Sequence, residues 1–461
     1  MRFDVAAGRG MGAVSAWLAA ADAGARLWEE DGLWASGAAR RLYRARSLWT
    51  ALAFAAALAG LALALPAAAA AAAVALYPVV FAVHLVAPAA GADITATYRD
   101  LLSVLLSPVV LSSLVPRMAA VGLLAAALAL LGAAAAALLR HRDRRQVRGG
   151  LWWRALGAPI DSTGAVRWAT GGFWHFIRGA AHVAEPSAAE LSRRYCELVS
   201  DSLGQPGYRE LVITAHDVDA RRDLVFALLA EPFRTSFAAP DQEHAHEGRL
   251  SELIDLGGAG ADHAVDALAG ALSVPGLCEP HRTTFAPESH WRGETHRLCD
   301  RPDVVVRLFE EVAAAGATQV IVVSAVATVD GPHALTPARL GLRPRAGELL
   351  ASVEAAALEA AVGAASHRFW GIYRIRPAHN PLGPFDLRGG YDDRSDRVFS
   401  LRELTHRGYE DAYRQFIEPI VGASGETIRT ATPTKTPDPD DLPLHGPGGG
   451  LDRPRALNLG L

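Results

Sequence analysis

The sequence predicts an α/β domain that is interrupted by a long apolar helical block. Three apolar runs bounded by polar turns are typical of strands, at residues 209–217, 319–325 and 367–376. Helical patterns at residues 304–315 and 347–362 lie between them, and strands that alternate with helices indicate an α/β sheet. The length of 461 residues allows two or three domains of average size.

The charge and cysteine content exclude several classes of protein. The chain has 45 basic and 49 acidic residues and a formal net charge of -4, so we expect no strongly basic surface and no nucleic-acid partner. The three cysteines, Cys196, Cys278 and Cys299, are too few and too scattered for a disulfide framework or a zinc cluster. We expect buried, reduced thiols in a cytoplasmic setting, and no cleavable secretory signal.

Residues 47–139 differ from the rest of the chain because they are almost continuously apolar. A helix over residues 48–65 would be about 27 Å long, which roughly matches the thickness of the hydrocarbon core of a membrane. The apolar run continues to residue 87, too far for one crossing, so Pro66 is expected to mark a hairpin before a second span. Residues 119–139 predict another span. Residues 101–115, with four serines, could cross, re-enter or lie at the interface.

Basic residues flank this block on both sides, and basic flanks stay on the cytoplasmic side of a membrane. They are Arg40, Arg41, Arg44 and Arg46 before it, and Arg140, Arg142, Arg144, Arg145 and Arg148 after it. Both ends on one side require an even number of crossings, four or alternatively two. The sequence therefore predicts an integral membrane protein with a cytoplasmic α/β domain, unless the block is a buried alanine-rich bundle. We expect a domain start at 1–46, membrane helices at 47–139, the remaining domain at 140–425 and a disordered tail at 426–461.

The segment AGRGMGA places Gly8, Gly10 and Gly12 between a predicted strand at residues 3–7 and a predicted helix at residues 14–21. One interpretation is the G-x-G-x-x-A turn of a dinucleotide site, with Glu29 or Glu30 as the ribose ligand. It would make the protein an FAD- or NAD-binding membrane oxidoreductase. The chain, however, continues into arginines and the apolar block rather than into further parallel strands.

The other interpretation is a nucleophile elbow, in which a sharp strand-to-helix turn presents a serine. GRGMGAVSAWLAA resembles the G-T-S-A-G-A elbow and small-residue helix of the patatin-like phospholipase family, with Gly10 at the position of the serine. Further segments resemble that family in the same order: RELVITAHDVDARRDLVF, AVDALAGALSVPGLCEP, HWRGETHRLCDRP, VVVRLFEEVAAAGATQVIVVSA and GYEDAYRQF. The resemblance covers about residues 3–40 and 150–425.

The resemblance implies a three-layer α/β/α domain that hydrolyses acyl esters of glycerolipids with a Ser/Asp dyad and no cofactor. Asp300 corresponds to the dyad aspartate, although D-R-P stands where the family has D-G-G or D-G-A. The family's glycine-rich oxyanion loop lies upstream of the elbow, where this chain has only a few residues. Since Gly10 has no oxygen to attack with, we expect a catalytically impaired protein that binds membrane lipid or a partner protein. A residual lipase is the alternative.

Other chemically capable residues have structural explanations. Ser15, one helical turn past the elbow, is expected to point into packing, and Ser273 is expected to be structural. His216 and Asp217, at a strand end, predict a hydrogen-bonded pair or, alternatively, an acid/base pair. His290, Glu294 and His296 could shape the loop of Asp300.

Two further groups of residues leave open alternatives. The motif EHAHE, with Glu243, His244, His246 and Glu247, is expected to be a solvated loop rather than a metal site. Four tryptophans follow the arginines and could lie at the level of lipid headgroups or in a core. They are Trp152, Trp153, Trp168 and Trp174.

Overall fold

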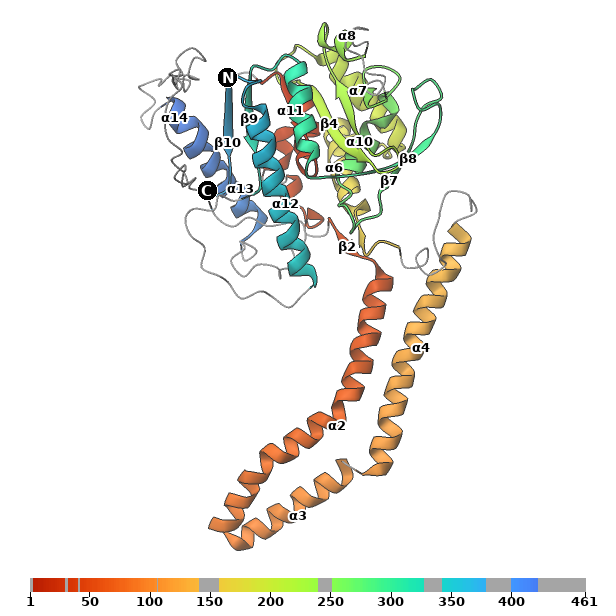
Figure 1. The fold of residues 1–461 in the computed structure, drawn as a ribbon, viewed down its shortest axis with the longest axis vertical. Coiled ribbons are helices and arrows are strands. Elements are labelled where there is room, and N and C mark those ends of the chain that lie inside the picture. The colour runs from red at the N-terminus through yellow and green to blue at the C-terminus, as the bar shows by residue number, and fades with distance from the viewer. Residues whose placement is uncertain are drawn as a thin grey trace, which may run out of the picture. The chain divides into compact units, whose positions relative to one another are not determined.

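The computed structural model describes residues 3–29, 32–39, 42–105, 107–140, 157–238, 251–326, 342–378 and 399–421. The chain divides into two compact units (Figure 1). One unit contains Met1–Arg44 and Ser162–Leu461, and the other contains Ala45–Asp161. The short strands β2 (Arg44–Ala45) and β3 (Ile160–Asp161) lie where the chain passes between the units.

The larger unit is built on a six-stranded mixed sheet. Its strands are β1 (Val5–Gly8), β4 (Glu210–Asp217), β5 (Arg222–Leu228), β6 (Leu253–Asp255), β7 (His281–Thr284) and β8 (Thr295–Cys299). The order is β6-β5-β4-β8-β7, and β1 also pairs with β4. β4 is parallel to β1 and antiparallel to β5 and β8. A separate parallel pair is formed by β9 (Gln319–Val323) and β10 (Gly371–Ile375).

Helices cover both faces of the sheet because alternate residues of β4 point to opposite sides. Leu211 and Ile213 pack with α1 (Gly12–Ala20), α6 (Thr163–Arg178), α7 (Ala188–Ser202) and α10 (Ala264–Ala271). Val212 packs on the other face, with α8 (Phe233–Ala238) and the end of α11 (Val304–Ala314). α11 in turn packs against α12 (Leu342–Ala365) and β9.

The remaining described elements of this unit are short. They are three 3-10 turns at Gly24–Leu27, Leu33–Ala35 and Ala261–His263, then α13 (Leu401–Ala412), a π-helical turn at Tyr413–Ile417 and α14 (Glu418–Val421).

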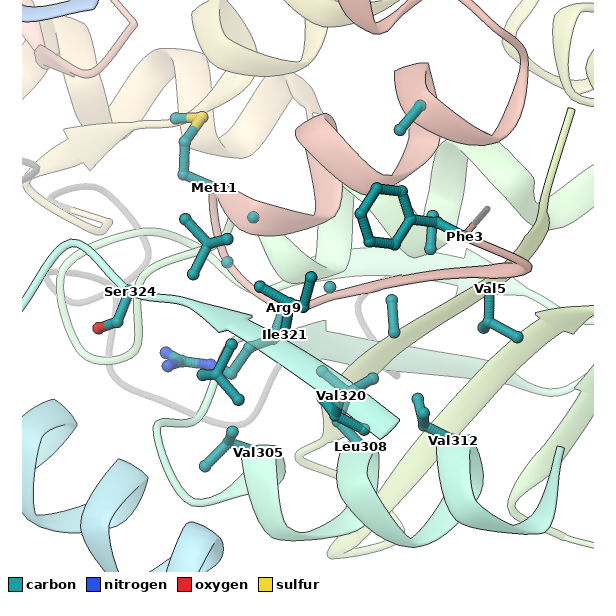
Figure 2. A pocket seen from close by; sticks show the side chains of 18 of the residues that line it. Phe3, Val5, Arg9, Met11, Val305, Leu308, Val312, Val320, Ile321 and Ser324 are labelled. Carbon is teal, nitrogen blue, oxygen red and sulfur yellow. The ribbon is translucent and has the colours of Figure 1, made fainter. Parts of the chain in front are cut away.

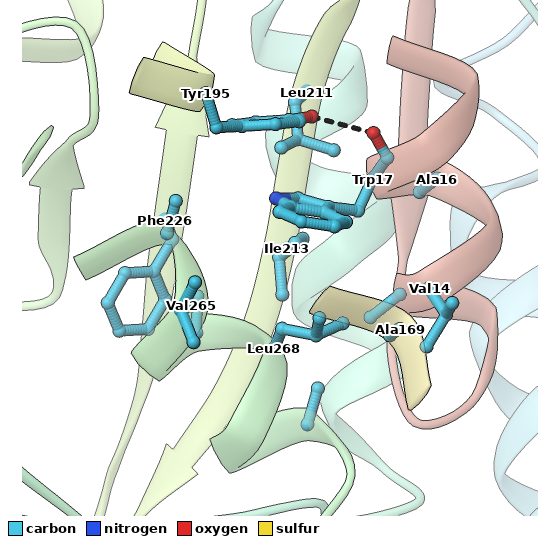
Figure 3. Packing of buried hydrophobic residues seen from close by; sticks show 14 of the residues in the cluster. Val14, Ala16, Trp17, Ala169, Tyr195, Leu211, Ile213, Phe226, Val265 and Leu268 are labelled. Atoms are coloured by element: carbon cyan, nitrogen blue, oxygen red, sulfur yellow. Dashed lines mark hydrogen bonds between the residues drawn. The ribbon is translucent and has the colours of Figure 1, made fainter. Parts of the chain in front are cut away.

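The main core fixes the position of α1. The indole of Trp17, fully buried on α1, stacks on the ring of Tyr195 from α7, with centroids 4.5 Å apart and planes 18° from parallel (Figure 3). The Tyr195 hydroxyl donates a 2.7 Å hydrogen bond to the carbonyl oxygen of Trp17. Large buried aromatic rings dominate core energetics, so these contacts hold α1, and the turn before it, against the sheet. Trp168 and Trp174 are also buried in this core, whereas Trp152 and Trp153 lie outside the described residues.

The smaller unit is helical. It contains α2 (Ser47–Val86), α3 (Pro88–Leu105) and α4 (Pro108–Arg140), and α2 packs against both other helices. The predicted hairpin at Pro66 is wrong, because α2 continues through this residue and the chain first leaves the helix at Ala87. The segments on both sides of Pro66 are rich in alanine and leucine, the residues with the strongest helix propensity, which offsets the tendency of proline to end a helix.

The predicted transmembrane block is wrong as well. In the part of the chain that the structure describes, no helix has both the length and the apolar character needed to cross a membrane. The expectations of four or two crossings and of an integral membrane protein fall with it. They depended on long runs of alanine, whose single methyl group adds little transfer free energy compared with leucine or isoleucine.

The predicted fold class, a patatin-like three-layer α/β/α domain interrupted by transmembrane helices, is therefore corrected to a mixed α/β fold with a mixed sheet. The strands predicted at residues 209–217, 319–325 and 367–376 are present as β4, β9 and β10. β9 and β10, however, pair with each other, and β4 has two antiparallel neighbours. Alternating apolar runs show where strands lie but do not set their direction. Residues 426–461 and the arginines Arg40, Arg41, Arg142, Arg144, Arg145 and Arg148 lie outside the described residues.

Candidate functional site

The candidate site lies where two strands meet end to end along one edge of β4. β5 pairs with β4 along Leu211–Asp217, so β1 and β8 share the remaining edge. β1 is parallel to β4 and ends opposite Ile213, and β8 is antiparallel and ends opposite His216. Their carboxyl ends therefore point toward each other across about 10 Å of β4, given a rise of about 3.3 Å per residue. The turn after β1 and the loop after β8 must meet there.

Gly10 and Asp300 face each other at this meeting point. Gly10 has a φ of 53°, in the left-handed region that favours glycine. A Cβ atom placed on Gly10 would lie 3.1 Å from Oδ2 of Asp300. Asp300 is buried, and its backbone N–H donates a 2.9 Å bond to the carbonyl oxygen of Ser273. The structure thus brings together the two positions that the sequence assigned to the dyad, and the D-R-P sequence does not keep Asp300 away.

The two flanking glycines have different physical roles. A Cβ atom on Gly8 would lie 2.4 Å from the backbone oxygen of Gly12, so the end of β1 and the start of α1 are too close for any side chain at this position. A Cβ atom on Gly12 would meet nothing within 4 Å. No side chain caps the N-terminus of α1, whose first residue is Gly12.

Arg9, between the glycines, binds the candidate aspartate. Its Nε donates to Oδ1 of Asp300 at 3.0 Å and its Nη2 donates to Oδ2 at 2.7 Å. Nη2 also donates to Oε1 of Glu354, from α12, at 3.3 Å. Burial acts to lower the pKa of the Arg9 guanidinium, but the charges and hydrogen bonds of Asp300 and Glu354 outweigh it and hold this pKa above its usual range.

Arg9 binds Glu354 through one hydrogen bond, whereas it binds Asp300 through two. Burial raises the pKa of the Glu354 carboxyl above the ordinary value, against the attraction of Arg9 and with the support of the Asp300 charge. One guanidinium thus serves two carboxylates in a partly enclosed site. The sequence pattern points to Asp300 and Gly10 but not to Arg9 and Glu354, because no motif spacing connects Arg9 or Glu354 to the other two residues.

These residues line a cavity of about 1440 Å³, larger than the roughly 300–1,000 Å³ typical of ligand pockets. Figure 2 shows its apolar side chains from three segments of the fold. They are Phe3, Val5 and Met11 around β1, Val305, Leu308 and Val312 on α11, and Val320 and Ile321 on β9. The cavity therefore has a long apolar wall, with Arg9, Asp300 and Glu354 beside the turn after β1. Further charged residues elsewhere in its lining are Asp4, Asp22, Arg209 and Glu210.

Other possible nucleophiles are poorly placed. Ser15 is exposed rather than packed, contrary to the expectation, and is not among the residues that line the cavity. The Ser273 hydroxyl donates to the carbonyl oxygen of Ala269, as expected for a structural serine. Ser324 lines the cavity, and its hydroxyl accepts the backbone N–H of Val326. Burial and then the charge of Asp300 raise the pKa of the Cys299 thiol to about 11, so little thiolate is present at neutral pH.

The predicted histidine sites form contacts away from Asp300. His216 does not pair with Asp217: its Nδ1 lies 2.8 Å from Oδ1 of Asp223. Asp217 is instead bound by His296, whose Nδ1 lies 2.5 Å from Oδ2 of Asp217. Nε2 of His296 lies 3.3 Å from Oε2 of Glu294. His290 packs edge-on against Trp291, whose ring also contacts His296.

The geometry gives no support to a dinucleotide or metal site. Glu29 is exposed and pairs with Arg26, and Glu30 lies outside the described residues. The carboxylates of Asp300 and Glu354 share the one guanidinium of Arg9 beside the glycine turn, and their excess negative charge would repel a pyrophosphate placed there. Within the described ranges, no group of three His, Cys, Asp or Glu side chains could hold a metal ion. The EHAHE residues Glu243, His244, His246 and Glu247 lie outside those ranges. The three cysteines, all among the described residues, are buried and form no disulfide.

Comparison of the chain with protein-family models, with curated proteins and with solved structures finds no match. Functional inference therefore depends on the residues and their geometry.

Proposed function

We propose that the protein binds the acyl chain of a lipid in this cavity and does not hydrolyse its ester, as an impaired relative of the patatin-like hydrolases. The observation that carries the proposal is the juxtaposition of Gly10 and Asp300 in a largely apolar cavity. The left-handed turn between β1 and α1 has the form of a nucleophile elbow, and the carboxylate lies where the base of a Ser/Asp dyad would be. The serine itself is missing.

The missing hydroxyl argues against hydrolysis. In acyl transfer by a serine hydrolase the hydroxyl oxygen forms a bond to the acyl carbon while its proton passes to a base. Removing a nucleophilic serine lowers turnover on the order of a millionfold in a well-studied protease. Among the described residues that line the cavity, Ser324 makes its hydrogen bond with backbone and not with an acid or base side chain. Binding is therefore the activity that the site retains.

The lining of the cavity supports an acyl ligand. Apolar side chains of α11 and β9 form a wall along which a hydrocarbon chain would lose contact with water, worth about 0.8 kcal/mol for each CH₂ group that is buried. The paired Arg9 and Asp300 place charged groups in the cavity wall beside the start of α1, where they would lie next to the ester or headgroup of the lipid. The alternative ligand is a partner protein. Displacement of a bound fluorescent fatty acid by unlabelled lipid distinguishes a lipid ligand from a protein ligand.

The test is an equilibrium titration of the purified protein with a fluorescent long-chain fatty acid, followed by displacement with unlabelled glycerolipid. Ile321→Trp, which places a bulky ring in the apolar wall and narrows the cavity, is expected to weaken binding at least about tenfold, equivalent to 1.4 kcal/mol. Val183→Trp, at an exposed residue that does not line the cavity, is the matched control and should bind like the wild type. Binding that Ile321→Trp leaves unchanged would show that the lipid does not occupy this cavity.

A fluorogenic acyl ester tests the absence of hydrolysis. The wild type is expected to turn it over no faster than Asp300→Ala. Appreciable wild-type turnover that Asp300→Ala abolishes would instead show an active lipase.

A further inference from the structure

We propose that Arg9 is a second block to acyl hydrolysis, independent of the missing serine, because its guanidinium occupies the oxygen of Asp300 that a serine at position 10 would need. The inference deepens the proposed function and rests on it. It assigns Arg9 a positioning role: Arg9 acts on the site through Asp300.

The two oxygens of Asp300 both accept hydrogen bonds from Arg9. Oδ2 is the atom nearest to the position of a Cβ at residue 10, at 3.1 Å. The same Oδ2 accepts the shorter of the two Arg9 bonds, 2.7 Å from Nη2, and Oδ1 accepts the other, 3.0 Å from Nε. Guanidinium and carboxylate are thus paired through two parallel hydrogen bonds, the strongest geometry for such a pair. A serine hydroxyl at residue 10 would have to give its proton to an oxygen that already accepts from the guanidinium, and protonation of that oxygen would weaken the ion pair.

Asp300 is not placed to move away from Arg9. Its backbone N–H is bound to the carbonyl oxygen of Ser273 at 2.9 Å. The next residue, Arg301, donates to Oδ2 of Asp223 at 3.1 Å, and Pro302 follows it. The loop is therefore held on both sides of Asp300.

Arg9 is also held. Its Nη2 donates at 3.3 Å to Glu354, whose helix α12 packs against α11. The side chain of Arg9 is only 18% exposed, so water screens the pair weakly. Release of Asp300 would leave a guanidinium and a carboxylate without each other in a partly enclosed site, which is costly.

The consequence can be tested with a serine installed at position 10. Gly10→Ser requires Asp300 to shift by a few tenths of an ångström and places a side chain on a left-handed residue, as nucleophile elbows do. Gly10→Ser is compared with the double variant Arg9→Thr/Gly10→Ser. Both are treated with a fluorophosphonate probe, whose phosphorus forms a bond to the serine oxygen as fluoride leaves and the serine proton passes to Asp300.

Arg9→Thr/Gly10→Ser is expected to react at least about 100-fold faster than Gly10→Ser, the lower end of what a positioned general base contributes. Adding Asp300→Asn to the double variant should return the rate to that of Gly10→Ser, an effect that a merely structural role of Arg9 would not produce. Equal rates for Gly10→Ser and a folded double variant would overturn the proposal.

Arg9→Lys/Gly10→Ser covers the case in which the threonine variant fails to fold. Lysine keeps the positive charge between the two carboxylates but cannot bind Asp300 through two parallel bonds. We expect Arg9→Lys/Gly10→Ser to be labelled at least about tenfold faster than Gly10→Ser, which is part of the rate increase that a general base provides. If the lysine variant is labelled no faster than Gly10→Ser, the proposal is again overturned. The lipid titration above separates the two ideas: a wild type that binds no lipid rejects the proposed function, whereas the ratio of labelling rates decides the role of Arg9.

Discussion

Asp217 and Asp300 are two buried carboxylates at the ends of neighbouring strands, and of the two only Asp300 lines the cavity described above. Asp217, the last residue of β4, is fully buried. Its Oδ2 lies 2.5 Å from His296 and its Oδ1 accepts the backbone N–H groups of Asp219 and Ala220, at 2.9 and 3.1 Å. Asp300, after β8, is paired with Arg9 and lies in the cavity wall. Burial and an ionisable partner are common to both, so access to a ligand is what distinguishes the candidate site.

The surroundings of the two aspartates explain the difference. His296 packs between the rings of Phe285 and Trp291, and Phe285 also contacts His263. This aromatic cluster encloses the Asp217–His296 pair and ties the β7–β8 hairpin to the end of β4. Asp217 therefore has a structural role, because it closes the turn after β4 and anchors the β7–β8 hairpin. Its contact with His296 only resembles an acid/base pair.

The largest effect is expected when each aspartate is replaced by alanine. Asp217→Ala leaves His296 and two backbone N–H groups without their acceptor, so it should lower the free energy of unfolding by about 3–5 kcal/mol. Asp300→Ala should cost less, since Glu354 remains for Arg9 and the site opens to the cavity. Urea unfolding of both variants gives the comparison. Equal losses would show that Asp300 is as structural as Asp217.

A smaller effect is expected from the glycines that bring the turn to Asp300. Gly8→Ala would place a Cβ 2.4 Å from a backbone oxygen, so β1 and α1 must separate, at a cost of about 1–3 kcal/mol. Gly12→Ala, which meets nothing within 4 Å, is the matched control and should change stability by less than about 0.5 kcal/mol. Thermal unfolding measures both. If Gly8→Ala is as stable as Gly12→Ala, close packing does not account for the first glycine.

The sequence could predict part of this site. The elbow at Gly10 and the loop at Asp300 were found through a resemblance between segments, and β4, β9 and β10 through their apolar pattern. Their meeting depends on β1 and β8 sharing one edge of β4 in opposite directions, which is a property of the tertiary pairing that local patterns do not contain. Arg9 and Glu354 come from segments that no motif links. The pair of His216 with Asp217 was wrong because adjacent residues of a strand point to opposite faces.

The transmembrane prediction failed because an alanine-rich sequence does not by itself indicate a membrane. A sum over a long alanine-rich run counts each methyl group as apolar, yet alanine is also the strongest helix former. Alanine-rich segments therefore favour long helices such as α2 and α4 whether or not a membrane is present. Pro66, which the sequence suggested as a turn, lies inside α2.

The smallest effect concerns Glu354, the carboxylate that shares Arg9 with Asp300. Because burial holds the pKa of Glu354 above its ordinary value of 4.5, the folded state keeps this proton more tightly than the unfolded state does. The stability that the protonated group contributes is complete below pH 4.5 and is lost as the pH rises through the higher pKa of the folded state. At neutral pH the ionised carboxylate therefore lowers the stability of the fold.

Glu354→Gln removes this charge and keeps an oxygen that accepts from Arg9. It should raise the free energy of unfolding at neutral pH by less than about 1 kcal/mol, since the side chain is partly exposed to water. The gain should shrink as the pH falls toward 4.5, where the wild-type carboxyl is protonated too. Urea unfolding across this pH range is the measurement, with Glu185→Gln, at an exposed residue, as the control for net charge. A gain that stays constant with pH would show that it does not come from the ionised carboxylate of Glu354. A loss of stability at neutral pH would show that the shared guanidinium already compensates both carboxylates, and Arg9 would then hold Asp300 less exclusively than its two hydrogen bonds indicate.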